Sequence, residues 1–206
     1  MTSPRIILAS QSPRRRELLA LAGVVFEVMP MAIDETPHVG EAPDLYVLRL
    51  AREKAAAACL AVSAERTSRV ACDTASVGEP IVIAADTTVS IDGDILEKPL
   101  DPAQARRMLT RLAGRRHQVC TGVALACGAH IEAFLSSSTV QFAPIDVATI
   151  EAYVATGEPM DKAGAYAVQG GAQAFIERIE GSYTGIMGLP LAETLDRLRK
   201  LGCAPG

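Results

Sequence analysis

The chain has 206 residues, 49% of them hydrophobic, which is enough for one domain or for two lobes with a shared core. Its formal charge of −4 argues against a nucleic-acid binder, which usually carries a broad basic face. No run approaches the roughly 20 apolar residues that span a bilayer, and no secretory signal is visible. The five cysteines are scattered without a CxxC pair, as is typical of reduced thiols. We therefore expect a soluble, cytoplasmic protein that binds neither membranes nor nucleic acid.

Predicted helices and strands are mixed along the chain. In chain order we expect a strand at 6–9, a helix at 13–22, a strand at 24–29, a helix at 44–64, a strand at 81–85, a hairpin turn at 92–93, a helix at 102–113, strands at 118–127 and 130–142, a helix at 147–156, a strand at 175–179 and a helix at 191–201. Because the Asp92-Gly93 hairpin pairs antiparallel strands, the sheet should be mixed. The sequence therefore predicts a single α/β domain over residues 1–206.

Capping residues set several of these boundaries. Ser12, Asp101 and Asp146 are suitable N-caps, and Pro follows the first two directly. Residues 65–80 contain Thr, Ser, Gly and Pro without a clear period, so we expect a loop there, which is long enough to be an insertion.

The first cluster of polar residues lies where the strand at 6–9 meets the helix that Pro13 begins. The segment 10–16 reads SQSPRRR. Free backbone N–H groups and the helix dipole favour an anion at this point, and arginine can hold phosphate oxygens in a bidentate fork. An ordinary capped helix with a solvated basic face is the alternative.

Lys54 interrupts an apolar helix face. At 100° per residue, Lys54 lies on the same stripe as Val47, Leu50 and Ala58. The lysine could extend its ammonium group to the protein surface or reach from this face into a phosphate site.

Asp86 follows the apolar run at 81–85, so we expect it at the end of a buried strand. Sheet-based enzymes commonly place their chemistry at such strand ends, although an Asp that caps a turn is the alternative. Weaker signals are Glu97 beside Lys98, and the segments 161–164 and 181–183. Each of these segments contains one glycine, which suggests either close backbone approach or a simple turn.

These positions together suggest a site for a metal and a phosphate. Mg²⁺ typically binds one or two carboxylates with phosphates and water, and Glu35 and Asp86 could supply them. Arg15, Lys54 and Lys98 are suited to phosphate. The sequence has no P-loop, no HExxH and no Gly-x-Ser-x-Gly motif, and its three histidines form no ligand pattern.

Several motifs in the same order resemble the Maf nucleoside triphosphate pyrophosphatases, from residue 6 to residue 201. They are SQSPRR at 10–15, LAREKA at 50–55, ADTTV at 85–89, EKP at 97–99, DKAGAY at 161–166, GSY at 181–183 and GLP at 188–190. The resemblance implies an elongated mixed sheet flanked by helices, with two lobes around a nucleotide cleft, and a homodimer. The segment 65–80 departs from the family pattern, which leaves loop and dimer contacts open.

The resemblance also assigns roles. It implies a divalent cation, Mg²⁺ or Mn²⁺, and Asp86 as the proton acceptor. We expect Asp86, Glu35 and Lys98 to be catalytic, Ser10, Arg15 and Lys54 to bind the substrate, and Asp86 with Glu35 to hold the metal.

Within the family, the chain looks like the branch that acts on dTTP and UTP. Arg14, Thr87 and Gln169 carry this interpretation, and the Gln169 amide offers a donor and an acceptor to the O4 and N3–H edge of uracil or thymine. The expected reaction is attack by water on the α phosphorus, which releases pyrophosphate from a nucleoside triphosphate. The alternatives are a nucleotide-binding regulator of septum formation and a pyrophosphatase for 7-methyl-GTP or purine nucleotides.

Overall fold

The computed structural model describes residues 4–69 and 79–203. Seven strands form one sheet in the order β2-β1-β3-β5-β6-β7, and β4 pairs with β3 away from this path. The elements are β1 (Ile6–Leu8), α1 (Pro13–Leu21), β2 (Glu27–Val28), α2 (Pro43–Arg69), β3 (Ile81–Ile91), β4 (Asp94–Leu96), α3 (Pro102–Leu112), β5 (Arg116–Cys127), β6 (His130–Phe142), α4 (Val147–Ala155), η1 (Glu158–Asp161), η2 (Ala163–Ala165), η3 (Gly171–Phe175), β7 (Ile176–Glu180), α5 (Tyr183–Ile186) and α6 (Leu191–Lys200).

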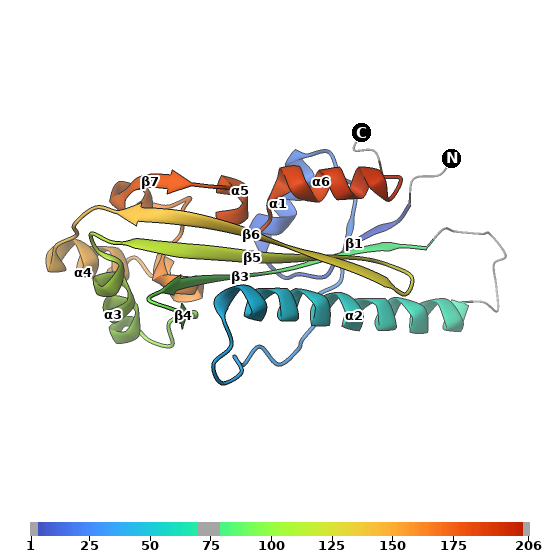
Figure 1. The fold of residues 1–206 in the computed structure, drawn as a ribbon, viewed down its shortest axis with the longest axis horizontal. Coiled ribbons are helices and arrows are strands. Elements are labelled where there is room, and N and C mark those ends of the chain that lie inside the picture. Colours follow the sequence, from blue (N-terminus) through green and yellow to red (C-terminus); the bar gives the residue numbers. More distant parts are fainter. Residues whose placement is uncertain (1–3, 70–78, 204–206) are drawn as a thin grey trace.

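The sheet is mixed, as the hairpin predicted. β1 runs parallel to β2 and β3, whereas every other pair of neighbouring strands is antiparallel. β3, β5 and β6 are long strands that run along the molecule, with α2 beneath them and α6 above them in Figure 1. At the tight turn between β3 and β4, Asp92 and Gly93 both have positive φ, which is the conformation that Asp-Gly hairpins favour.

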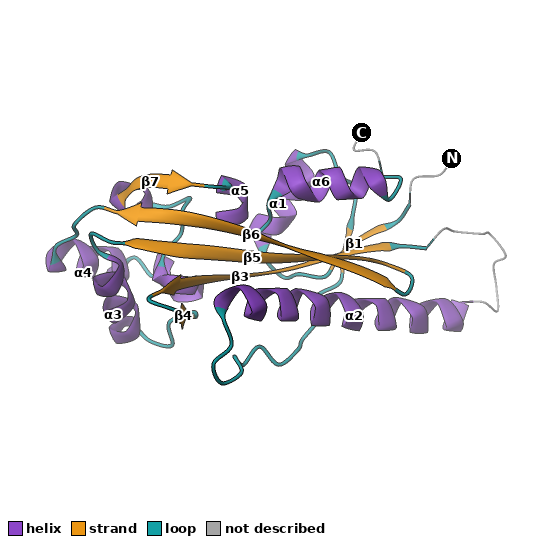
Figure 2. Cartoon of the chain, viewed as in Figure 1, coloured by secondary structure: helices purple, strands orange, loops and turns teal. Residues whose placement is uncertain are grey.

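At one end of the sheet, helices cover both faces (Figure 2). Ala51, Ala55 and Ala58 of α2 pack on one face with Ala84, while Leu18 of α1 packs on the opposite face. Since both faces are buried there, residues 81–85 form a continuous apolar run without alternation.

A separate apolar core lies at the other end of the long strands. It joins Val89 of β3 and Phe142 of β6 to Tyr153 of α4 and Phe175, with α3 packed against it. Residues 81–85 of β3 belong to the cores on the two faces at the first end of the sheet, and Val89 belongs to this one. Residues 86–88 lie between them along the strand. The two ends correspond to the two predicted lobes, and polar residues lie on β3 between them.

Three predicted boundaries were wrong. β3 continues to Ile91, so Asp86 lies inside the strand; the β-branched residues 87–89 sustain it. The strand expected at 24–29 contains only Glu27–Val28. α2 extends to Arg69, so the segment expected as a loop at 65–80 begins as helix, and residues 70–78 lie outside the described part of the chain.

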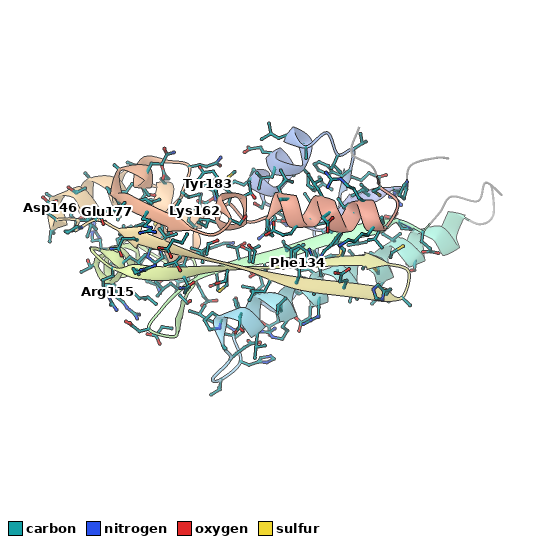
Figure 3. The ribbon with its side chains drawn as sticks, turned by 45° about the horizontal axis from the view of Figure 1, so that its top comes forward. Arg115, Phe134, Asp146, Lys162, Glu177 and Tyr183 are labelled. Carbon is teal, nitrogen blue, oxygen red and sulfur yellow. The ribbon has the colours of Figure 1, made fainter. Side chains whose placement is uncertain are left out.

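Smaller features also differ. Ser12 precedes α1, but its side chain makes no capping bond, unlike those of Asp101 and Asp146. The short helix α5 lies between the strand and the helix predicted at 175–179 and 191–201, where no element was predicted. Figure 3 labels Phe134 on β6. α6 packs on the sheet through Arg197, whose guanidinium carbon lies 3.7 Å from the centre of the Phe134 ring. Within residues 4–69 and 79–203, no helix is long and apolar enough to cross a membrane.

Candidate active site

A buried ion pair joins α2 to the middle of β3. Lys54 Nζ lies 2.6 Å from Asp86 Oδ1, and both residues are buried. The close approach of α2 depends on Gly122 of β5, which pairs with Asp86 in the sheet register. A Cβ at Gly122 would lie 2.4 Å from the carbonyl oxygen of Val47 in α2. The missing side chain therefore allows the helix to bring Lys54 to Asp86.

A second carboxylate reaches the same ammonium group. Glu35 Oε1 lies 2.6 Å from Lys54 Nζ, in the loop before α2. The hydroxyl of Tyr46 donates a 2.8 Å hydrogen bond to the backbone carbonyl of Glu35 and so fixes this part of the loop. The carboxylates of Glu35 and Asp86 thus converge on the same ammonium group, and their role as metal ligands stays a prediction.

The surrounding charges favour an ionised Glu35. Burial raises its pKa, but the hydrogen bond and charge of Lys54, together with the charges of Lys98 and Arg15, outweigh burial and lower the pKa overall. Lys98 is itself exposed, and its charge acts on Glu35. The charges of the three predicted phosphate-binding bases therefore all act on Glu35.

Arg15 is held in one orientation by three hydrogen bonds. Its Nε donates to the carbonyl of Gly188 at 2.8 Å, and its two terminal nitrogens donate to Ser10 Oγ at 3.0 Å and Thr87 Oγ1 at 3.2 Å. Burial lowers the pKa of Arg15, against the opposing charges of Asp86 and Glu35. The guanidinium is fixed before any substrate binds, which reduces the entropy lost when it engages a phosphate.

Thr87 is part of a chain of hydroxyl groups. Thr121 Oγ1 donates to the carbonyl of Gly185 at 2.8 Å, so at its 2.9 Å contact with Thr87 the Thr121 oxygen is the acceptor. The Thr87 proton is therefore directed to Thr121, while its oxygen accepts from Arg15. In this arrangement Thr87 orients Arg15, and its predicted role in base selection stays a prediction.

Ser10 marks the predicted anion position before α1. Its hydroxyl oxygen accepts from the Ser12 backbone N–H at 3.2 Å as well as from Arg15. Ser10 is buried, and the first turn of α1 begins at Pro13. The helix N-terminus, Ser10 and Arg15 thus lie together, as the sequence predicted.

The remaining two predicted specificity residues lie apart from this cluster. Gln169 is exposed and lies in the loop between η2 and η3. Arg14 is close enough to Tyr153 for its charge to act on the phenol, and the Tyr153 hydroxyl accepts from the backbone N–H of Ala167. Arg14 and the Gln169 loop are therefore both linked to Tyr153.

Two further residues organise the site, Tyr46 and Thr121, and neither was predicted from the sequence. Tyr46 has no distinguishing pattern, because an aromatic residue on an amphipathic helix usually serves the core. Thr121 has a detectable signal in the sequence, since it is a hydroxyl residue within the apolar run of β5. The structure shows that it is fully buried.

The donor set fits a hard divalent cation. Among the described residues, no group of three or more His, Cys, Asp and Glu side chains is placed to hold a metal ion. Mg²⁺ commonly takes only one or two carboxylates and completes its shell with phosphate oxygens and water. Glu35 and Asp86 supply that number of carboxylates beside bases suited to phosphate.

The chain is a mixed α/β protein with a cluster of paired acidic and basic side chains around the middle of β3. The family model described as "Maf-like protein" matches residues 5–201, so this chain belongs to the Maf-like family.

Relatives named "dTTP/UTP pyrophosphatase" include the following three. The protein of Aromatoleum aromaticum is 48% identical, with 96% of each chain covered. That of Burkholderia pseudomallei is 50% identical over 95% of this chain and 93% of its own. That of Anaeromyxobacter dehalogenans is 47% identical over 97% and 95%. Among solved structures, the Staphylococcus aureus Ham1 protein aligns with a TM-score of 0.47 and 14% identity, over 83% of this chain and 90% of that chain.

Proposed function

We propose that this chain is a nucleoside triphosphate pyrophosphatase that hydrolyses dTTP and UTP to the monophosphate and pyrophosphate. The convergence of Glu35 and Asp86 on Lys54, beside the fixed guanidinium of Arg15, is the observation that carries the proposal. Three relatives of 47–50% identity and nearly full coverage bear the name of this activity. Removal of unwanted nucleotides from the pool is the corresponding role in the cell.

Binding of the triphosphate follows from the charges. A nucleoside triphosphate carries several negative charges, and Arg15, Lys54 and Lys98 neutralise part of them. Arg15 presents fixed N–H donors, while lysine ammonium groups act as point charges. Phosphoryl transfer depends mostly on such positioning and charge neutralisation.

Asp86 is the acceptor for the proton of the attacking water. Water attacks the α phosphorus, the bond from that phosphorus to the bridging oxygen breaks, and pyrophosphate leaves with the bonding electrons. The water proton passes to Asp86 and then to solvent. Lys54 holds the carboxylate of Asp86 in place through its 2.6 Å hydrogen bond.

Glu35 and Asp86 would hold the divalent cation, Mg²⁺ or Mn²⁺, which supplies charge neutralisation for the phosphates. The Lys54 ammonium group already lies between these carboxylates, so their geometry suits a positive charge. Equilibrium dialysis with Mn²⁺ alone tests the assignment, since Glu35→Gln should weaken binding whether or not the protein is active.

The homodimer stays a prediction from the resemblance, and the cytoplasmic location stays a prediction from the cysteines and the lack of a visible secretory signal. Sedimentation equilibrium of the purified chain measures its assembly state directly.

The activity is tested by incubation of the pure protein with Mg²⁺ or Mn²⁺ and each canonical nucleoside triphosphate. We expect release of pyrophosphate and monophosphate chiefly from dTTP and UTP. Preference for a purine nucleotide would overturn the assignment of Arg14, Thr87 and Gln169. Binding without turnover of any nucleotide would reject the enzyme and favour a regulatory role.

A further inference from the structure

The loop that carries Gln169 is held at both ends by two side chains, Tyr153 and Glu158. The Tyr153 hydroxyl accepts from the backbone N–H of Ala167 at 3.2 Å and donates to Glu158 Oε1 at 2.7 Å. The other oxygen of Glu158 accepts from the backbone N–H of Gly171 at 3.1 Å. Ala167 and Gly171 lie two residues before and two residues after Gln169.

Packing fixes both members of this clamp. Tyr153 is only 5% exposed, and its ring meets Phe175 edge to face with 5.2 Å between the ring centres. A Cβ at Gly170 would lie 2.2 Å from Glu158 Oε1. Gly170 has an extended backbone with φ −152, so glycine is required there for space and not for conformation.

Base selection by a glutamine needs such a support. Uracil and thymine present an acceptor at O4, whereas cytosine presents a donor at N4. A glutamine amide carries both an acceptor and donors, so it can satisfy either pattern by turning over. A backbone held in one position limits where this amide can meet the base, and so supports discrimination between the two patterns.

Arg14 lies near the clamp. It is the second residue of α1, directly before Arg15, and its charge acts on the phenol of Tyr153. A second predicted specificity residue, besides Gln169, is therefore close to the clamp.

We infer that Tyr153 and Glu158 are positioning residues for pyrimidine selection, which act by fixing the Gln169 loop through the Ala167 and Gly171 amides. This inference rests on the proposed hydrolysis of dTTP and UTP. Neither residue touches the reacting phosphate, so loss of the clamp should alter substrate selection and KM while kcat for UTP stays nearly constant.

The test compares Tyr153→Phe and Glu158→Gln with the wild type on UTP and CTP. We expect the ratio of kcat/KM for UTP to that for CTP to fall about three- to tenfold, which corresponds to the free energy of one hydrogen bond. The change should appear in KM. The matched control is Glu151→Gln, since Glu151 lies on α4 in an exposed pair with Arg106 and should leave both constants unchanged. Gly170→Ala, which displaces the Glu158 carboxylate, should reproduce the effect.

Hydrogen exchange at the amides of Ala167 and Gly171 measures the clamp independently of turnover, and exchange should be faster in Tyr153→Phe. If the wild type prefers UTP and the variants keep the same preference and KM, the clamp is rejected while the proposed function stands. A uniform loss of kcat with an unchanged ratio would also reject it and indicate a merely structural role. If the wild type hydrolyses no nucleotide, the proposed function fails and the inference fails with it.

Discussion

Asp86 accepts a 2.6 Å hydrogen bond from Lys54, and the two side chains are only 13% and 9% exposed. The pair connects the middle of β3 to α2, between the apolar cores at the two ends of the sheet. Removal of one partner of a buried ion pair leaves the other charge buried and unpaired, which lowers the free energy of unfolding. The pair therefore fixes the position of the proposed proton acceptor as well as the packing of α2.

Asp86→Asn should lower kcat for UTP at least about 10²-fold, because an amide cannot accept the water proton. The amide is nearly the same size as the carboxylate, so the fold should survive, and circular dichroism checks this. Asp92→Asn is the control, since Asp92 lies at the exposed turn after β3 and should leave kcat unchanged. Near-normal turnover by Asp86→Asn would remove Asp86 from the role of base.

Lys54→Met should destabilise the protein by about 3 kcal/mol, because it leaves the carboxylate of Asp86 buried and unpaired beside that of Glu35. Urea unfolding measures the free energy of unfolding. Adding Asp86→Asn to Lys54→Met should restore part of the loss, since it removes one of the two like charges. Lys200→Met, which breaks an exposed pair with Asp196, should cost under about 1 kcal/mol. A double variant less stable than Lys54→Met would contradict this account.

Gly122→Ala should move α2 away from the sheet, because the added methyl would meet the Val47 carbonyl at 2.4 Å. Overpacking of this kind costs about 1–3 kcal/mol. Since Lys54 lies on the same helix, kcat should fall as well, while the chemical groups of the site are all retained. Stability and activity that both match the wild type would show that the close approach at Gly122 is not needed.

His117 should make stability fall in mild acid. Burial lowers its pKa to about 4, with a small opposing contribution from the backbone of Arg115. The folded state therefore favours the neutral ring. The contribution of His117 to the free energy of unfolding is complete above about pH 6.5 and is lost as the pH falls from there towards 4. Between pH 7 and pH 4.5 this amounts to about 2 kcal/mol.

The variant for this test is His117→Gln, which can still pair with the Tyr166 hydroxyl, 2.8 Å from His117 Nε2. Unfolding by urea at pH 7 and pH 4.5 should show a smaller loss of stability for the variant than for the wild type. Equal losses would exclude His117 as the source of the acid sensitivity.

Much of this architecture could be predicted from the sequence. The Asp92-Gly93 turn fixed the β3–β4 hairpin, and the caps Asp101 and Asp146 placed α3 and α4. Lys54 was singled out because it interrupts an apolar stripe, and in the structure its ammonium group pairs with Asp86 and Glu35.

Other features depend on contacts between distant segments, which local patterns do not contain. Asp86 was expected at a strand end, because a carboxylate normally interrupts a buried strand; the ammonium group of Lys54 from α2 allows β3 to continue. The Thr87–Thr121–Gly185 chain and the clamp on the Gln169 loop likewise join residues that are far apart in sequence.

Hydrolysis of UTP in ¹⁸O-labelled water tests the central claim most directly, because it identifies the phosphorus atom that water attacks. Mass spectrometry of the products should find the label in UMP and none in pyrophosphate, as attack on the α phosphorus requires. Label in pyrophosphate, or release of orthophosphate with UDP, would contradict the proposed reaction.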